Sequence, residues 1–203
     1  KNYTATEFLE YVSVLKGIKG ANKQQITELL NFVNLYESRD KKIGTFSGGM
    51  LRRVGLAQTL LGNPEVIILD EPTAGLDPIE RIRLRNLLSE IANDRTVIVA
   101  THIVPDVEYI ANYIIMLFKG NVAANASPDV LISEIAGKVW SVKADIKEAE
   151  AYIKRFKVSN IFSEKSIYDL RIISDTKPLE AAEEVFPTLE DVFLYYSFMR
   201  GEK

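Results

Sequence analysis

The stretch TFSGGMLRRVGLAQTLLGNPEVIILDEPTAGLDP, residues 45–78, decides the fold of this chain. It begins with Ser47-Gly48-Gly49, which opens the helix-forming segment GGMLRRVGLAQTLLG. Serine is a favourable N-cap, and two glycines remove side chains, so backbone N–H groups can approach an anion closely. A helix N-terminus also carries a partial positive charge, which suits a phosphate group. An ordinary capped helix is the alternative interpretation of this turn taken alone.

An apolar run, VIIL, follows and ends in Asp70-Glu71-Pro72. Parallel α/β sheets place their ligands at the carboxyl ends of the strands, where these two acids would lie. Asp70 is a candidate for holding Mg²⁺ through water, because oxygen ligands suit a metal that bridges phosphates. Glu71 is a candidate general base for an attacking water, and we expect Pro72 to keep the Glu71 backbone extended. A turn that merely ends a strand is the alternative.

A second apolar run, TVIVAT, is rich in β-branched residues and predicts a parallel strand at residues 96–101. Continuous apolar runs of this kind indicate strands that are covered on both faces. His102, the only histidine, follows this run and would lie beside the two acids. It could donate a hydrogen bond to a terminal phosphate or to its attacking water. Segment 78–94 predicts an amphipathic crossover helix whose inward side chains are Ile79, Ile82, Leu87, Leu88 and Ile91.

The flanking regions differ from this central block. Apolar residues at helical spacing predict one helix behind a Thr4 or Thr6 cap and a second helix through residues 24–37. Further on, the sequence predicts a strand pair joined by a tight turn, then two strands with a helix between them, and a last helix capped by Thr188. We expect an α/β fold whose first domain, 1–137, contains a helical subdomain, 1–62, and a core, 63–137. A small α+β accessory domain, 138–203, would follow a boundary near Gly137.

The composition excludes several classes of protein. A formal net charge of −3 and a pI near 5.4 provide no basic field, which argues against a nucleic-acid partner. The absence of cysteine excludes disulfides and thiolate metal sites, and it suits a reducing cytoplasm. The longest apolar run, YIIMLF, is far shorter than the roughly 20 residues that cross a bilayer, so we expect any membrane role to go through a partner.

Taken in chain order, FSGGM, VIILDEP, AGLDP and VIVATH resemble the ATP-binding subunit of ABC transporters. The signature motif of that family reads LSGGQ, so Ser47, Gly48 and Gly49 match, and Met50 replaces the usual glutamine. The resemblance runs over about residues 4–125. The segment TLEDVFLYY resembles the tail of bacterial ABC exporter subunits, which pair with separate membrane permeases. The implied fold is a P-loop NTPase core.

The resemblance implies a role for each candidate residue. Asp70 would be the Walker B aspartate that holds Mg²⁺, Glu71 the catalytic base and His102 the switch histidine. Asp77 would be the D-loop aspartate, although GLDP also reads as a plain helix start. The turn at residues 47–49 would contact nucleotide. The implied cofactors are ATP and Mg²⁺, the implied activity is ATP hydrolysis, and the implied partners are a transmembrane permease and a second ATP-binding subunit. The location would be cytoplasmic, on the inner face of the membrane.

A phosphate-binding P-loop, G-x-x-x-x-G-K-[ST], does not occur in the 203 residues. The only Gly-Lys pair is Gly137-Lys138, with Val139 after it and Ile132 where the first glycine should be. We therefore expect a subunit truncated after the family's Q-loop. Alone, it should bind ATP weakly or not at all, and uncovered strand edges should make it self-associate.

Three other functions stay open at this point. A naturally shortened, non-catalytic ABC module could lend its signature helix to a partner ATPase. A soluble ABC-type ATPase of DNA repair or translation would share these motifs, but it usually brings coiled coils or basic segments. A metal-dependent hydrolase built on Asp70, Glu71 and His102 would need further ligands than the sequence offers. For the accessory domain we expect a regulatory role or a dimer contact.

Overall fold

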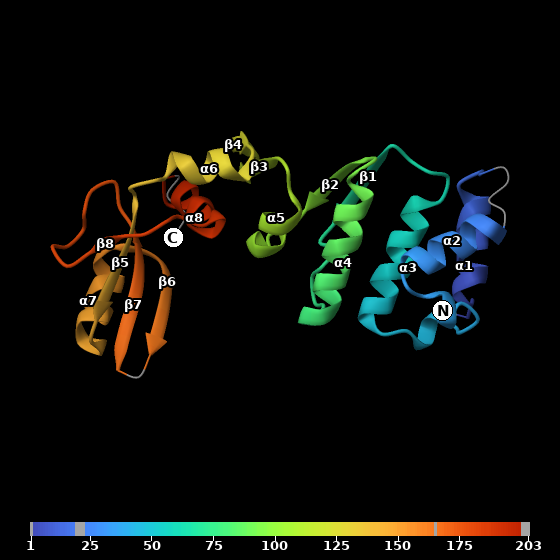
Figure 1. Cartoon of the computed structure of the whole chain (residues 1–203), viewed down its shortest axis with the longest axis horizontal. Helices are drawn as coiled ribbons and strands as arrows, with labels where there is room; N and C mark the ends of the chain where they lie inside the picture. Colours follow the sequence, from blue (N-terminus) through green and yellow to red (C-terminus); the bar gives the residue numbers. More distant parts are fainter. Residues whose placement is uncertain (1, 19–22, 165, 200–203) are drawn as a thin grey trace. The chain divides into compact units, whose positions relative to one another are not determined.

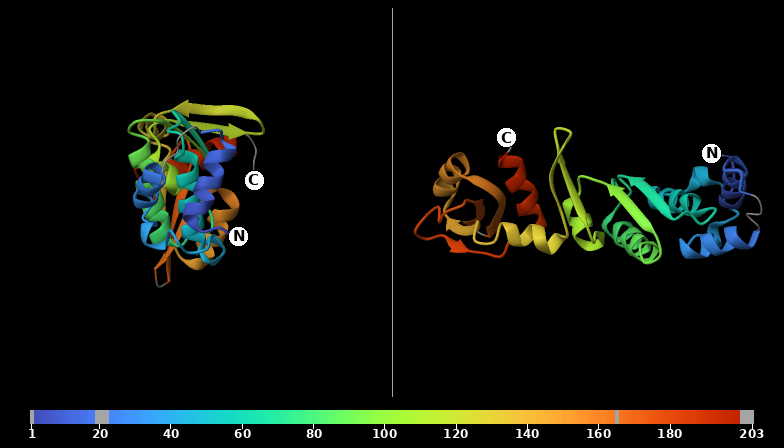
Figure 2. Two further views of the ribbon diagram at one scale, coloured as in Figure 1. Left: turned by 90° about the vertical axis from the view of Figure 1, so that its right-hand side faces the viewer. Right: turned by 90° about the horizontal axis from the view of Figure 1, so that it is seen from above.

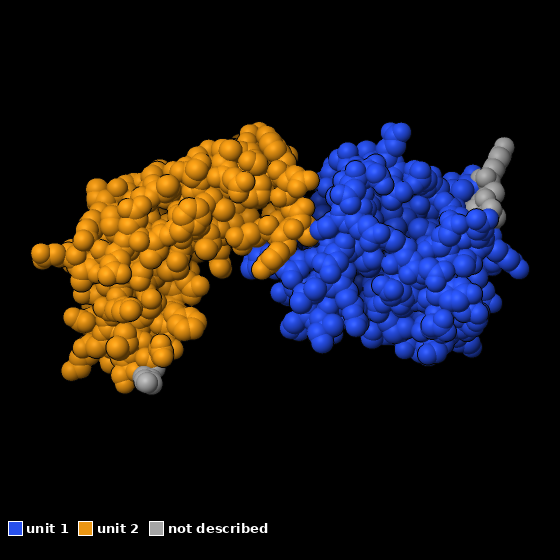
Figure 3. All heavy atoms as spheres, in the orientation of Figure 1, with its two compact units in different colours: residues 1–106 blue, residues 107–203 orange. Residues whose placement is uncertain are grey.

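A computed structural model describes residues 2–18, 23–164 and 166–199. The C-terminal helix was expected over residues 188–201, and its last two residues lie outside these ranges. The chain divides into two compact units, residues 1–106 and 107–203 (Figure 3). The boundary that we expected near Gly137 therefore lies inside the second unit. Each unit is described by itself.

The first unit begins with a packed group of helices. These are α1 (Ala5–Leu15), α2 (Lys23–Phe32) and α3 (Gly48–Leu60), with short 3₁₀ turns η1 (Tyr36–Ser38) and η2 (Ile43–Thr45) between the last two (Figure 1). Of the two possible caps of α1, the structure uses Thr4, which forms a capping box with Glu7. All three helices pack against one another around buried side chains of Leu9, Ile26, Leu30, Val33, Val54 and Ala57.

Two parallel strands follow, joined by a helix. Strand β1 (Val66–Asp70) pairs with β2 (Thr96–Ala100), and Ile68 lies opposite Ile98. The connecting helix is α4 (Pro78–Ile91), and α5 (Val104–Ile110) comes after β2. The predicted parallel pair and crossover helix are thus present. Because the two strands are parallel and in register, the residues that follow each of them meet at one edge of the sheet.

The inward face of α4 differs from the prediction. Ile79 and Ile82 are 64% and 49% exposed, whereas Leu84, which we did not place inward, is 2% exposed. At 100° per residue, both isoleucines lie on the side of the helix opposite the buried residues Leu84, Leu87, Leu88 and Ile91. The apolar residues of this segment therefore form two faces, and only one of them is buried.

The expected burial of β1 and β2 on both faces is also wrong for the described residues. Ile67 is 3% exposed, but Val66, Ile68 and Ile98 are 53%, 71% and 49% exposed. Side chains alternate across a strand, so these three lie on one face of the two-stranded sheet. No described element covers that face.

The second unit contains two antiparallel sheets. Strands β3 (Ile114–Phe118) and β4 (Asn121–Ala126) form the predicted hairpin, which stands out as a two-stranded ribbon in Figure 2. Lys119 and Gly120 in its turn have φ of 49° and 77°, as a type I′ turn requires. Helix α6 (Pro128–Glu134) leads to a four-stranded sheet in the order β6-β7-β5-β8. Its strands are β5 (Val139–Ala144), β6 (Lys157–Glu164), β7 (Ile167–Ile173) and β8 (Glu183–Glu184).

Two helices complete the second unit. Helix α7 (Ile146–Arg155) packs on β5 and β7, and α8 (Leu189–Met199) packs on β6 and α6. The α8 contacts explain why the unit begins before Gly137. Phe193 packs on Phe118 of β3, with ring centroids 5.2 Å apart, and the Tyr196 hydroxyl donates to a Glu134 carboxylate oxygen at 2.6 Å. The C-terminal helix thus joins the hairpin and α6 to the four-stranded sheet.

Candidate active site

The first turn of α3 presents open backbone. The Ser47 hydroxyl accepts a hydrogen bond from the Met50 N–H at 3.2 Å, so it caps the helix as predicted. A Cβ placed on Gly48 would meet no heavy atom within 4 Å. An approaching anion would therefore find free space at Gly48, next to the N-terminus of a helix of 13 residues.

The two acids lie at the carboxyl end of β1, as the sequence indicates. Asp70 is exposed and ends the strand, and the Glu71 N–H donates to the Ala100 carbonyl of β2 at 2.8 Å. The expectation that Pro72 keeps Glu71 extended is wrong, because Glu71 has φ of 45°. This is the left-handed region, which residues other than glycine rarely adopt and which is enriched at functional sites. The backbone turns sharply here.

The Glu71 carboxylate is held by the residues that follow β2. One oxygen, Oε1, accepts from the His102 backbone N–H at 3.0 Å and lies 2.6 Å from His102 Nδ1. The other, Oε2, accepts from the Thr101 hydroxyl at 3.0 Å. Glu71 and His102 thus meet across the paired strands, although 30 residues separate them in sequence. The imidazole is 79% exposed, so its other nitrogen is accessible.

These contacts keep Glu71 ionised. The side-chain hydrogen bond with His102 lowers the pKa of Glu71 below its ordinary value of 4.5, and the Thr101 hydroxyl and His102 backbone lower it further. The desolvation of the carboxyl group acts in the opposite direction and is outweighed. Two oxygens offer about four acceptor positions, and three are filled here. The described residues leave one acceptor position on Oε2 that a water molecule could fill.

Asp77 has a structural task in this chain. Its carboxylate accepts the Glu80 N–H at 2.9 Å and so caps α4, with Pro78 in the first turn. This is the plain helix start that the sequence also allowed. The capping carboxylate is nevertheless exposed at the surface, at a turn where a further contact is sterically possible.

The candidates are brought together only in part. A cavity of about 480 Å³ lies between α3, β1 and α4, and its lining includes Gly48, Arg52 and Asp70. Ser47, Glu71, Asp77 and His102 do not line it. The described residues contain no cluster of three or more acidic or histidine side chains that could enclose a metal. A single carboxylate such as Asp70 fits Mg²⁺, which keeps several of its own waters.

Sequence reasoning missed two residues of this region. Thr101 fixes one oxygen of Glu71, and its position at the end of an apolar run was the available signal. Glu80 lies against the signature turn, because a Cβ on Gly49 would come within 2.5 Å of its carboxylate. Nothing in the sequence linked Gly49 to Glu80, since they belong to different helices, α3 and α4.

The comparisons with known proteins agree with the motifs. A sequence model of the family described as ABC transporter matches residues 1–74. The chain is 32% identical to an uncharacterized ABC transporter ATP-binding protein, YxlF, of Bacillus subtilis (strain 168), over 94% of this chain and 70% of that protein. It is 36% identical to ABC transporter A family member 1 of Dictyostelium discoideum, over 73% of this chain and 17% of that protein. Its relatives thus include bacterial and eukaryotic proteins.

One solved structure, described as an ATP binding subunit of an ABC transporter, is similar in fold. It superposes with a TM-score of 0.55 at 26% identity, over 65% of this chain and 56% of that subunit. The expected α/β fold class is confirmed. The chain spans less than two thirds of this subunit and of the Dictyostelium protein.

Proposed function

The chain belongs to the family of ABC transporter ATP-binding proteins. On that premise we propose that the complete polypeptide, which includes a P-loop, binds and hydrolyses ATP to power transport through a separate membrane permease. The observation that carries the proposal is the position of Glu71. Its ionised carboxylate lies at the carboxyl ends of two parallel strands, held by Thr101 and His102, with one acceptor position open. A carboxylate held in this way can orient a water molecule and take its proton.

The neighbouring residues have distinct tasks in this proposal. Asp70 would hold Mg²⁺ through water, and the bound ion would neutralise phosphate charge. The open turn at Ser47 and Gly48 would contact the phosphates of a nucleotide held by a second ATP-binding subunit, and Asp77 would lie near the contact between the subunits. His102 would fix Glu71 through Nδ1 and leave its other nitrogen for a hydrogen bond.

The test is the substitution Glu71→Gln in the complete polypeptide. We expect ATP turnover to fall by about 10²–10⁴-fold, because the amide cannot accept the proton, while ATP binding stays within about threefold of the wild type. Glu90→Gln, at an exposed position of α4, is the matched control and should leave turnover unchanged. Wild-type turnover in Glu71→Gln would overturn the assignment of the base.

We further propose that the P-loop of this site is supplied from outside these 203 residues. The single Gly-Lys pair, Gly137-Lys138, connects α6 to β5 and has no glycine five positions earlier. Residues 1–203 alone should therefore bind Mg-ATP weakly or not at all, because the main phosphate donors are absent from them. Isothermal titration measures this directly, and tight binding would contradict the proposal.

A second candidate function follows from the same observation. An open signature turn without a P-loop in the same stretch also fits a non-catalytic module that completes the site of a partner ATPase. Both functions require a partner, and both place the chain beside a membrane permease at the inner face of the membrane. No described helix is long and apolar enough to span a membrane. The mass of the native protein separates the two, since the module would have a mass of 22.9 kDa and the complete ATPase a larger one.

A further inference from the structure

The two glycines in the first turn of α3 have different neighbours. Gly48 faces open space, but a Cβ on Gly49 would lie 2.5, 2.6 and 2.7 Å from Oε2, Cγ and Cδ of Glu80. Non-bonded heavy atoms attract one another at about 3.5–4.0 Å, so even alanine at position 49 would overlap with this side chain. Gly49 therefore makes room for a glutamate of another helix, in addition to any contact with a ligand.

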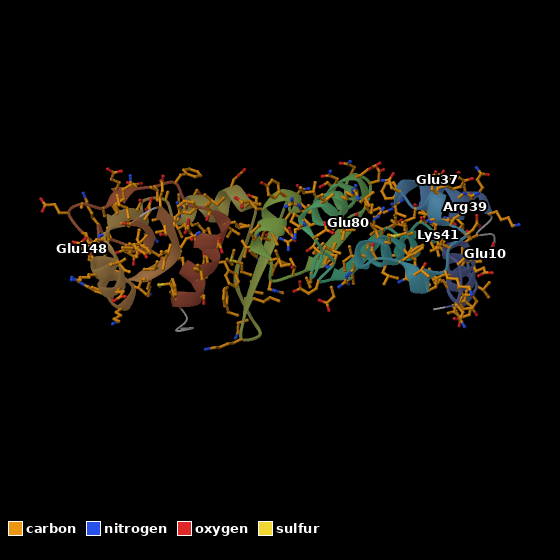
Figure 4. All side chains as sticks on the ribbon, turned by 90° about the horizontal axis from the view of Figure 1, so that it is seen from below. Glu10, Glu37, Arg39, Lys41, Glu80 and Glu148 are labelled. Carbon is orange, nitrogen blue, oxygen red and sulfur yellow. The ribbon has the colours of Figure 1, made fainter. Side chains whose placement is uncertain are left out.

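Glu80 cannot easily move away from that position. One carboxylate oxygen pairs with Arg53 Nε at 3.2 Å, and the other pairs with Arg83 Nη1 at 2.5 Å. Arg53 and Glu80 have side chains only 10% and 14% exposed, whereas Arg83 is 58% exposed. Separating the Arg53–Glu80 pair would leave the largely buried guanidinium of Arg53 without a carboxylate and Glu80 with only the more exposed Arg83, which is unfavourable. Glu80, labelled in Figure 4, lies in the first turn of α4.

Arg53 also reaches a third helix. Its Nη1 donates to the backbone carbonyls of Val33 at 3.0 Å and of Asn34 at 3.1 Å, just after α2 ends. The planar guanidinium thus joins the end of α2 to the first turn of α4 through the body of α3. A lysine at position 53 could not make these contacts simultaneously, because its ammonium is a single point of charge.

The pair joins two turns that matter for the proposed function. Ser47 caps α3 two residues before Gly49, and Asp77 caps α4 through the N–H of Glu80 itself. The Glu80 backbone N–H thus bonds the cap of α4, and the Glu80 side chain pairs with Arg53 of α3. If the Ser47–Gly48 turn moved relative to the Asp77 turn, the Arg53–Glu80 ion pair would have to break; otherwise the two turns must move together.

We propose that Arg53 and Glu80 are positioning residues that hold the Ser47–Gly48 turn at a fixed distance from the Asp77 turn, with Gly49 as the necessary clearance. The proposal rests on the proposed ATP hydrolysis for its consequence, although not for its geometry. Neither side chain needs to touch nucleotide. Their effect is on the spacing of two turns that would contact it.

The geometry is tested without any activity. Residues 1–203 contain no cysteine, so once any cysteine outside them has been replaced by serine, a cysteine pair at Leu51 and Ile79 carries spin labels only at those two sites, which are 48% and 64% exposed. In the complete polypeptide, Glu80→Gln should broaden the distribution of distances between the labels, because the amide removes the charge and keeps the shape. Glu90→Gln, at an exposed position near the other end of α4, is the control and should leave the distribution unchanged. An unchanged distribution in Glu80→Gln would overturn the proposal.

The consequence for hydrolysis is tested by kinetics and rescue. Glu80→Gln and Arg53→Lys should each lower kcat by about tenfold, because small misplacements of catalytic groups are costly, with the KM for ATP within about twofold. Gly49→Ala should lower kcat by clearly more than about tenfold, because it adds the overlap with Glu80. Adding Glu80→Ala to it should restore kcat to the level of Glu80→Ala alone, because the overlap is removed while the ion pair stays absent. No rescue, or an unchanged kcat in Glu80→Gln, would contradict the proposal. If the wild type hydrolyses no ATP, the proposed function fails, and the label distances still decide the geometry.

Discussion

An apolar face is buried in the four-stranded sheet of the second unit but exposed in the two-stranded sheet of the first unit. In the second unit, Leu170 and Ile172 are completely buried beneath α7, in a cluster completed by Val142, Ala144, Ala149 and Ala182. In the first unit, Ile68 and Ile98 are 71% and 49% exposed on adjacent strands. The helix that covers the second sheet lies between two of the sheet's own strands in the chain, after β5 and before β6. The first sheet has one face for which the described residues provide no cover.

The difference separates local stability from the need for a partner. Burial of apolar surface contributes roughly 25 cal/mol per Å², so the second sheet is stabilised by its own unit. The exposed face of β1 and β2 contributes no such stabilisation until another segment or chain covers it. Asp70 ends β1 and Glu71 follows it, so the candidate site lies at the sheet whose apolar face is exposed. Four predictions address this comparison.

The largest effect should separate matched core deletions in the two sheets. Leu170→Ala should lower the free energy of unfolding of the second unit by about 3.5 kcal/mol, because it removes a fully buried side chain and leaves a cavity. Ile68→Ala should cost less than about 0.5 kcal/mol, because this side chain is mostly in solvent. Trp140, the only tryptophan, reports the unfolding of the second unit by fluorescence, and amide hydrogen exchange in peptides from residues 1–106 follows the first. Equal losses of unfolding free energy in Leu170→Ala and Ile68→Ala would show that the two sheets do not differ in the burial of these faces.

Next in size is a buried ionic contact that joins the second sheet to α8. The Asp191 side chain is 2% exposed, pairs with Arg171 at 2.6 Å and accepts from the Ser159 hydroxyl at 2.6 Å. Burial raises its pKa, but the hydrogen bonds from Arg171, Ser159 and the Thr188 backbone outweigh this, so the pKa lies below 3.8. Asp191→Asn should cost about 3 kcal/mol at neutral pH.

The pH dependence of this cost has a definite sign. Because the folded-state pKa of Asp191 is depressed, the stabilisation is fully present above 3.8 and is lost as the pH falls through the lower folded-state value. The difference between wild type and Asp191→Asn should therefore shrink in acid. Asp175→Asn, in an exposed pair with Lys138, is the control and should change stability by less than about 0.5 kcal/mol. A difference that stays constant into strong acid would show that the charge does not contribute.

A smaller effect concerns self-association of residues 1–203 through the uncovered face. Ile68→Lys should raise the dissociation constant by at least about tenfold, because covering one such side chain contributes about 1.5 kcal/mol or more. Phe162→Lys places the same charge at a 73% exposed position of the second sheet and should have little effect. Light scattering over a range of concentrations measures both. A monodisperse wild-type monomer would show that the exposed face does not associate.

The smallest effect should be the same in both units. Thr4 caps α1 and Asp145 caps α7, each in a capping box with a glutamate three residues later. Thr4→Ala and Asp145→Ala should each cost about 1 kcal/mol, since a cap acts through local hydrogen bonds rather than through the cover of a sheet. Thermal unfolding of each variant checks this. A clear difference between the two would mean that helix caps also depend on how well each unit is packed.

Local patterns predicted much of this fold and part of the candidate site. The caps at Ser47 and Asp77 follow from residue type, and the parallel pairing of β1 and β2 follows from their apolar runs. Their failures are informative as well. Ile79 and Ile82 are apolar but exposed, because their apolar character does not reveal which side of the helix is covered. Glu71 has a left-handed φ, although the following proline favours an extended backbone.

Patterns along the chain were enough to predict the helices and strands and the order of the motifs, because these depend on neighbours a few positions away. The meeting of Glu71 and His102 could be expected because parallel strands bring their carboxyl ends to one edge of a sheet. The packing of the folded chain, by contrast, determines that Thr101 and His102 fill three of the acceptor positions of Glu71 and that Gly49 lies against Glu80. It also decided which apolar faces are covered. Those properties depend on the packing of segments about 30 residues apart, where side chains compete for the same space, and no local periodicity encodes that outcome.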